Sequence, residues 1–142
     1  MQGALFDTSI YVNAIRRGDA AVLTLRRVNA ELPLWVSAVV LEELYAGAGD
    51  RAHREVKRLE REFDGIRRIL VPNLRDWSDA GEVLARLATK YGYEQVGRGR
   101  LTNDALIATS ASRLGIRVIT ANDRDFRRLA EFRSFQWQVM TL

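Results

Sequence analysis

Cysteine is absent from this 142-residue chain, and histidine occurs only once. The lack of cysteine excludes disulfides, zinc sites built from thiolates, and cysteine nucleophiles. The single histidine, His53, lies in a densely charged segment and is expected to face solvent. Catalytic triads and histidine metal motifs therefore have little to build on. Any bound metal ion is expected to be held by oxygen ligands.

Long apolar runs are also missing. No stretch approaches the roughly 18 residues expected of a membrane-spanning helix, and the first residues lack the basic-then-apolar pattern of a signal peptide. The chain shows no internal repeat, low-complexity tract or linker. With 47% apolar residues, the sequence predicts a soluble, cytoplasmic protein, folded as a single domain over residues 1–142 and not associated with a membrane.

Basic residues outnumber acidic residues by 22 to 18, which gives a formal net charge of +4. All of the basic residues except Lys57 and Lys90 are arginine, whose guanidinium group binds phosphate bidentately. A modest positive charge suits nucleic acid but is also compatible with many other partners. The charge therefore supports a nucleic-acid substrate without identifying one.

Short apolar segments alternate with amphipathic segments along the chain. Strands are expected at residues 4–6, 32–36, 69–72, 117–119 and 135–140, the last at a sheet edge. Helices are expected at about 10–17, 19–28, 38–47, 50–64, 76–91, 103–114 and after 123. This order predicts an α/β sandwich with a short, mainly parallel central sheet flanked by helices. The residues expected to cap helices are Thr8 or Ser9, Ser37, Thr102 or Asn103, and, at a C-terminus, Gly115.

Acidic residues recur where strands end and helices begin. Asp7 follows the first strand, and Asp104 lies on the core-facing stripe of its helix. Glu43 lies on the apolar side of its helix, whereas Glu42 lies on the side of small residues, so Glu43 is the expected inward acid. Taken singly, Asp7 also fits an ordinary turn, and Asp104 also fits a residue that caps its helix or complements its dipole.

The turn after the fourth expected strand carries Asn122, Asp123 and Asp125. Either Asn122 or Asp123 fits an ordinary helix cap. As the residue that opens the helix, Asp123 is expected to face the strand ends. Asp125 lies about 200° further round the helix, where it is placed to cap the helix or to pair with Arg128.

Considered together, these acids favour a metal site. In an open α/β sheet, functional groups gather where the chain leaves the carboxyl ends of the strands. Carboxylates that are about 4 Å apart repel each other by about 4 kcal/mol per pair at an effective dielectric of 20. A divalent cation makes such a cluster tolerable. A set of oxygen ligands alone suits Mg²⁺ or Mn²⁺, and such sites serve phosphodiester hydrolysis.

Four segments resemble, in order, the motifs of the PIN domain ribonucleases, in particular the VapC toxins of toxin–antitoxin pairs. They are residues 5–9, 43–47, 103–108 and 119–126, and the resemblance extends over about residues 4–140. The resemblance implies a PIN-like three-layer sandwich and an Mg²⁺-dependent ribonuclease with an acidic core of Asp7, Glu43 and Asp104. It also implies a homodimer and a small VapB-type antitoxin that inserts into the active-site groove.

One position departs from the commonest family pattern. The family often has aspartate two residues after the threonine that corresponds to Thr120, and this chain has Asn122 there. Part of the family has asparagine followed by an Asp-Phe pair, which Asn122, Asp125 and Phe126 satisfy, whereas Asp123 supplies a charge one residue further on. Which of these residues completes the site stays open.

The favoured interpretation is an endoribonuclease in which Asp7 and Asp104 bind Mg²⁺, with Mn²⁺ as a substitute, and Glu43 and Asp123 complete the catalytic set. Arg98 and Arg100 precede Asp104 in a glycine-containing segment that equally fits a solvated loop. Two other interpretations are a catalytically inactive PIN-like module that binds RNA or protein, and a related DNA nuclease. The candidates for positioning substrate or water are Ser9, Asn122, Asp125, Arg98 and Arg100.

Overall fold

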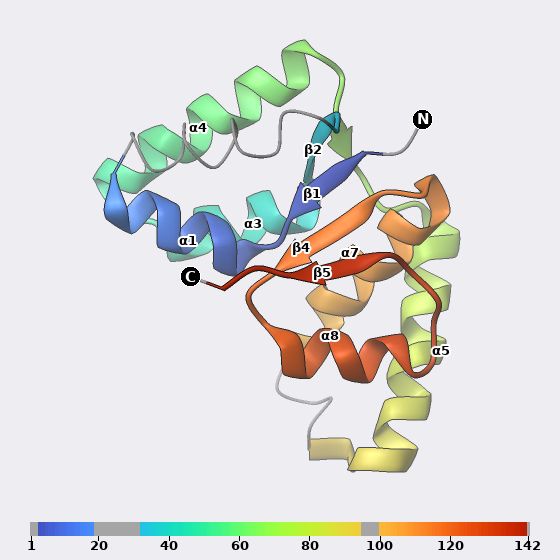
Figure 1. The fold of residues 1–142 in the computed structure, drawn as a ribbon. Helices are drawn as coiled ribbons and strands as arrows, with labels where there is room; N and C mark the ends of the chain where they lie inside the picture. Colours follow the sequence, from blue (N-terminus) through green and yellow to red (C-terminus); the bar gives the residue numbers. More distant parts are fainter. Residues whose placement is uncertain (1–2, 19–31, 95–99, 142) are drawn as a thin grey trace.

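The computed structural model describes residues 3–18, 32–94 and 100–141. A five-stranded sheet is flanked by helices on both sides (Figure 1). The predicted three-layer α/β architecture is thus confirmed. The strands are β1 (Ala4–Phe6), β2 (Leu34–Ser37), β3 (Ile69–Leu70), β4 (Arg117–Thr120) and β5 (Trp137–Val139). The helices are α1 (Thr8–Arg17), α3 (Ala38–Gly47), α4 (Asp50–Gly65), α5 (Leu74–Tyr91), α7 (Arg100–Leu114) and α8 (Asp123–Ala130).

The strand order is β3-β2-β1-β4-β5, and all neighbouring strands are parallel. The chain first moves outward from β1 to β2 and β3, then crosses back to β4 and β5. Because parallel crossovers are right-handed, this reversal places the helices of the two halves on opposite faces of the sheet. Accordingly, α1, α3 and α4 pack together on one side, and α5, α7 and α8 pack together on the other.

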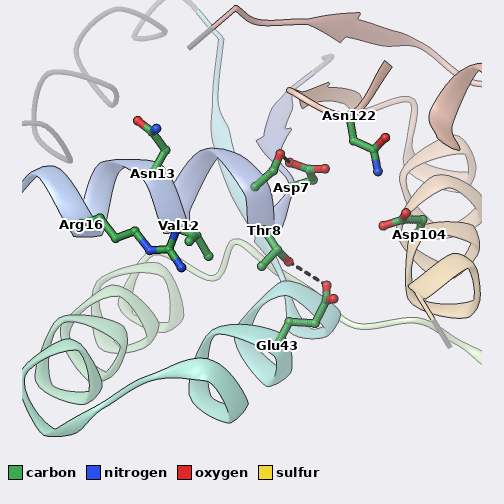
Figure 2. Close-up of a pocket in the computed structure, with 9 residues that line it drawn as sticks. Asp7, Thr8, Val12, Asn13, Arg16, Glu43, Asp104 and Asn122 are labelled. Atoms are coloured by element: carbon green, nitrogen blue, oxygen red, sulfur yellow. Dashed lines mark hydrogen bonds between the residues drawn. The ribbon is translucent and has the colours of Figure 1, made fainter. Parts of the chain in front are cut away.

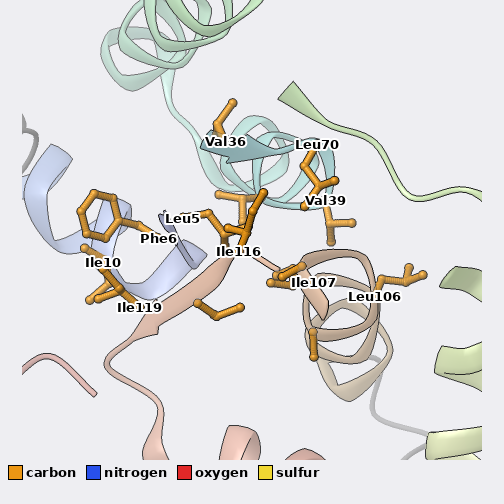
Figure 3. Packing of buried hydrophobic residues seen from close by; sticks show 14 of the residues in the cluster. Leu5, Phe6, Ile10, Val36, Val39, Leu70, Leu106, Ile107, Ile116 and Ile119 are labelled. Atoms are coloured by element: carbon orange, nitrogen blue, oxygen red, sulfur yellow. The ribbon is translucent and has the colours of Figure 1, made fainter. Parts of the chain in front are cut away.

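The core lies on both faces of the central strand. All three residues of β1 are buried, as expected for a parallel strand that is covered by helices on both sides. Ile107 points from α7 toward the strands, while Val36 of β2 and Val39 of α3 pack in the same cluster (Figure 3). The amphipathic α4 contributes the buried stripe that its sequence spacing predicts, formed by Val56, Leu59 and Phe63.

Three helices begin earlier than the sequence pattern predicts. Helix α5 begins at Leu74 because Asn73 and Asp76 form a reciprocal capping box, with both N–H···O bonds at 2.9 Å. Helix α1 begins at Thr8, so neither Thr8 nor Ser9 caps it. Helix α7 begins at Arg100, so Thr102 and Asn103 lie within its first turn and the predicted caps there are also wrong.

Ser37 caps α3 as predicted, because its hydroxyl accepts a hydrogen bond from Val39 N at 3.1 Å. Gly115 ends α7 in the left-handed region with φ +67°, which is the predicted C-terminal cap. Gly3 is required for a different reason. A Cβ there would lie 2.7 Å from the carbonyl oxygen of Pro33, at the start of the β1–β2 pairing. The helix predicted at 19–28 lies outside the described residues.

Candidate active site

The carboxyl ends of β1 and β4 lie side by side at the centre of the sheet. After β1 the chain leaves through α1 toward β2, whereas after β4 it leaves through α8 toward β5. Diverging connections of this kind leave a crevice in which α/β proteins generally bind ligands. A cavity of about 450 Å³ lies here (Figure 2). It is lined by Asp7, Thr8, Ser9, Val12, Asn13, Arg16, Glu43, Asp104 and Asn122.

Asp7 is fixed to the end of β1 through its backbone and its side chain. Its amide donates to the carbonyl oxygen of Ile119 at 3.0 Å, which extends the β1–β4 pairing. The Ser9 hydroxyl donates to Oδ1 at 2.5 Å, and the Thr120 hydroxyl donates to Oδ2 at 2.6 Å. Asp7 is only 4% exposed, and this burial raises the pKa of its carboxyl. The two hydroxyl donors reduce that rise because they stabilise the ionised form.

The two hydroxyls that hold Asp7 also connect the two turns of the site. Ser9 Oγ accepts from Ala121 N at 3.2 Å, and Thr120 Oγ1 accepts from Asn122 N at 2.8 Å. Each hydroxyl therefore donates to the carboxylate while it accepts from the β4–α8 turn. Asp7 consequently fixes the start of α1 relative to the start of α8.

Glu43 reaches the cavity from α3. The Ser37 cap fixes where that helix begins, and Glu43 then lines the cavity while the neighbouring Glu42 is exposed and does not. Thr8 Oγ1 donates to Glu43 Oε1 at 2.7 Å, the bond drawn as a dashed line in Figure 2. This bond joins the first turn of α1 to α3.

Asp104 reaches the same cavity from α7, on the opposite side from Asp7 in Figure 2. It is half-buried, whereas Ala105, Ile107 and Ala108 beside it are buried in the core. The side chain therefore lies at the border of the core-facing stripe, where its carboxylate enters the cavity and remains accessible to solvent.

In the last turn, Asn122 is the residue that lines the cavity. Its side-chain oxygen accepts from Asp125 N at 3.2 Å, and its amide nitrogen donates to Asp125 Oδ2 at 2.9 Å. These bonds cap α8 and orient the Asn122 amide. Asp125 thus contacts the site through Asn122 and does not line the cavity itself.

Asp123 does not face the strand ends as predicted. Its carboxylate accepts two hydrogen bonds from Arg127 Nη2, at 2.9 and 3.0 Å, one turn further along α8. An aspartate in the first turn and an arginine four residues later are a favourable pair on a helix surface. This pairing takes Asp123 away from the lining of the cavity. Arg98 lies outside the described residues. Arg100 opens α7, and its side chain is not described.

The sequence interpretation did not include four other residues that line the cavity: Thr8, Val12, Asn13 and Arg16. Together with Ser9 they follow the side of α1 that faces the site. Their spacing of three to four residues is a readable signal, because once Ser9 is placed near Asp7 the helical period brings Asn13 and Arg16 to the same face.

The donor chemistry of the cavity fits a hard divalent cation. Asp7, Glu43 and Asp104 provide carboxylate oxygens and Asn122 an amide oxygen, without cysteine or histidine in the lining. Within residues 3–18, 32–94 and 100–141, however, no three acidic or histidine side chains lie close enough to hold one ion. The carboxylates of Asp7 and Glu43 are instead turned toward the hydroxyls that donate to them. To bind one ion together, the three carboxylates would have to move closer to one another.

The fold and cavity define an α/β protein with a carboxylate-lined site at the switch point of a parallel sheet. The chain belongs to the PIN domain family, whose sequence profile matches residues 4–132. Members of this family are generally nucleases and typically use divalent metal ions. The sequence has no match among curated proteins.

Solved structures share this fold over the whole chain. DNA-bound VapBC from Salmonella typhimurium has a TM-score of 0.69 and 22% identity, with 98% of each chain covered. VapBC-1 from nontypeable Haemophilus influenzae has a TM-score of 0.66 and 25% identity, again with 98% of each chain covered. VapBC2 from Rickettsia felis, bound to a promoter DNA fragment, has a TM-score of 0.65 and 23% identity, with 99% of this chain and 100% of that chain covered. None of the helices in the described part of the chain is long and apolar enough to cross a membrane.

Proposed function

We propose that this chain is a single-domain, Mg²⁺-dependent endoribonuclease and the VapC-type toxin of a toxin–antitoxin pair. The observation that carries the proposal is the meeting of Asp7, Glu43 and Asp104 in one cavity at the switch point of a PIN domain fold. These acids come from three separate elements, so their meeting is not a consequence of local sequence. Asp7 is also buried. Burying a carboxylate costs stability even when hydroxyl groups donate to it, and such groups cluster at functional sites.

In this proposal Asp7 and Asp104 hold the cation, and Glu43 completes the set. When bound, Mg²⁺ or Mn²⁺ supplies Lewis acidity to the phosphate oxygens and to the attacking water. The hydroxyls of Ser9 and Thr120 favour the ionised form of the Asp7 carboxylate and orient it. The chain itself thus provides the carboxylates that hold the cation and the hydroxyls that orient Asp7.

Asn122 replaces the acid that the family often has in the last motif. A neutral amide orients water or a phosphate oxygen by hydrogen bonding, but it adds no charge to a cation. Asp125 holds that amide in place. We therefore assign Asn122 and Asp125 to positioning. Asp123, which pairs with Arg127, is a weaker candidate than its sequence position suggested.

The test is cleavage of labelled single-stranded RNA and DNA, side by side, with Mg²⁺ and with EDTA. We expect RNA to be cut internally only with the metal, and Asp104→Asn and Glu43→Gln to reduce cutting to background. Glu42→Gln is the matched control, because this neighbouring acid is exposed and does not line the cavity. Preferential cleavage of DNA would favour the related DNA nuclease, and binding without cleavage would favour an inactive module.

The similarity to VapBC structures supports a small VapB-type antitoxin as partner. We also propose that the chain is cytoplasmic and forms a homodimer. Expression of the chain alone is then expected to slow growth of a bacterial host, and a small protein encoded beside it is expected to relieve the effect. Toxicity that persisted in Asp7→Ala would contradict a cause in metal-dependent cleavage. Light scattering of the purified chain tests the dimer.

A further inference from the structure

A second cavity adjoins the carboxylate-lined one. Its volume is about 480 Å³, and it lies between the end of α1 and the start of α4. Arg16 lines both cavities. The side chain of Arg16 extends along α1 in Figure 2, on the same helix as Asn13 and Val12. The two cavities therefore adjoin at Arg16 and together follow α1, and we call this run of two cavities the path.

The charge changes sign along this path. The first cavity carries the carboxylates of Asp7, Glu43 and Asp104, whereas the second carries Arg16, Arg17 and Arg51 against Asp50 and Glu55. Glu55 also pairs with Arg58, at 3.8 Å. In the described part of the chain, no ion pair involves Arg16, Arg17 or Arg51.

Helix stability explains only part of this arginine cluster. Arg16 and Arg17 lie in the last turn of α1, where cations complement the helix dipole. Arg51 lies in the first turn of α4, at the positive end of that helix, where a cation is disfavoured. Arg51 nevertheless lines the cavity together with the other two. An anion bound there would compensate for this placement.

The distance along the path suits a polymer more than a small ion. Ser9, Asn13 and Arg16 share one side of α1, and Ser9 and Arg16 are about 10 Å apart along the helix axis at 1.5 Å per residue. A phosphodiester held at the carboxylates would thus have another phosphate of the same strand near Arg16 and the second cavity. The guanidinium forks of arginine match phosphate oxygens.

We propose that the cavity lined by Arg16, Arg17 and Arg51 binds the backbone phosphates of the same RNA strand whose scissile phosphate lies at the carboxylates. This inference rests on the proposed nuclease function and adds the direction in which the strand runs, from Asp7 along α1 toward the start of α4. Contacts of this kind fix the register of the strand and do not read its sequence.

The test measures binding without requiring cleavage. Fluorescence anisotropy of a labelled single-stranded RNA is recorded over a salt series in EDTA, with all variants built on Asp104→Asn. We expect Arg51→Gln and Arg16→Gln each to weaken binding about threefold at low salt. Each is also expected to reduce the slope of log K against log salt by about 0.7, the value for one phosphate contact on a single strand.

The matched control is Arg54→Gln, which removes the same charge from an exposed position of α4 outside the cavity. We expect it to change neither quantity. Arg51→Lys, which keeps the charge, is expected to restore most of the slope. Melting temperatures of all variants confirm that each is folded.

The possible outcomes separate the two proposals. If Arg51→Gln and Arg54→Gln weakened RNA binding equally, the cause would be a general loss of positive charge. The proposal that the second cavity binds phosphates would then be wrong, even if the wild type cuts RNA. If the variants changed RNA binding as expected but the wild type did not cut RNA, the phosphate-binding cavity would be supported and the proposed nuclease function would be wrong. Unchanged RNA binding combined with weaker antitoxin binding in Arg51→Gln would overturn the inference and assign the cavity to a protein partner.

Discussion

Asp7 combines burial with charge, and the consequence depends on pH. Its carboxyl pKa is raised from the ordinary 3.8 by burial. The folded chain therefore binds this proton more tightly than the unfolded chain does. The free energy of unfolding then falls as pH rises from the unfolded pKa through the higher folded pKa. Above its folded pKa the ionised Asp7 therefore lowers the stability of the fold relative to the protonated form.

We expect Asp7→Asn to raise the melting temperature in EDTA at pH 7, because it removes the buried charge. The amide oxygen of the new side chain can accept from one of the two hydroxyls of Ser9 and Thr120, and its amide nitrogen can donate to the other. The gain is expected to shrink as pH approaches 3.8. Thermal melts across this pH range measure it, with the exposed Asp64→Asn as control. A gain of equal size at every pH would contradict burial of charge as its cause.

The three polar residues of the last turn now differ in their expected importance. Asn122 lines the cavity, Asp125 orients the Asn122 amide, and Asp123 pairs with Arg127 on the surface. We expect Asn122→Ala to lower cleavage by about 10- to 100-fold, the usual cost of losing an orienting group near a metal. Asp125→Ala is expected to cost less, and Asp123→Ala least.

Single-turnover cleavage rates at saturating Mg²⁺ measure this order. Arg127→Ala is the control for Asp123, because it breaks the same surface pair from the other side. If Asp123→Ala caused the largest loss while Arg127→Ala caused none, Asp123 would turn toward the metal during the reaction, and the assignment of Asn122 would be wrong.

At the scale of elements, the sequence predicts most of the fold because its patterns are local. The stripe of Val56, Leu59 and Phe63 defines α4, and Gly115 defines the end of α7. The starts of helices are less predictable because one side chain has several available partners. The hydroxyls of Thr8 and Ser9 fit helix caps by sequence, but they donate to Glu43 and Asp7 instead.

The prediction of the site is limited in the same way, because one polar side chain has several available partners. Glu43 and Asp104 are identifiable because acids on apolar helix faces are rare and costly, and Asp7 because it follows a buried strand. Asp123 was misplaced because its i,i+4 pairing with Arg127 competes with an inward orientation. The contribution of Arg16 depends on how α1 and α4 meet in space, which the sequence pattern does not contain.

A partly buried ion pair connects α5 with α7. Asp76 is 1% exposed, and Arg113 Nε donates to its two carboxylate oxygens at 3.1 and 3.0 Å. Asp76 also belongs to the capping box of α5. The pair therefore fixes the start of α5 against α7, the helix that carries Asp104.

We expect Arg113→Ala to destabilise the protein by about 2 kcal/mol, because it removes a charged hydrogen-bond donor from the buried Asp76 carboxylate. Arg75→Ala is the control. Its side chain is 82% exposed and pairs with Asp79 at 3.6 Å, so its loss should cost less than about 1 kcal/mol. Urea unfolding measures both. Similar losses in the two variants would mean that the Asp76–Arg113 pair contributes no more than a surface pair.

At the scale of the whole molecule, the carboxylates of the site come from elements on both sides of the sheet. Asp7 follows β1, Glu43 belongs to α3 on one side, and Asp104 belongs to α7 on the other. A cation that binds all three would hold the two helical layers together. Because this arrangement exists only in the folded chain, metal binding should stabilise the whole fold.

We expect Mg²⁺ or Mn²⁺ to raise the melting temperature as its concentration increases. At 100 times the dissociation constant the gain is about 2.7 kcal/mol, which corresponds to roughly 10 °C for a domain of this size. Asp104→Asn should lose most of the rise, and Glu42→Gln should keep it, since Glu42 is exposed on α3 beside the site. Differential scanning calorimetry over a metal titration measures the rise. An equal rise in wild type and Asp104→Asn would place the bound metal away from the carboxylate-lined cavity.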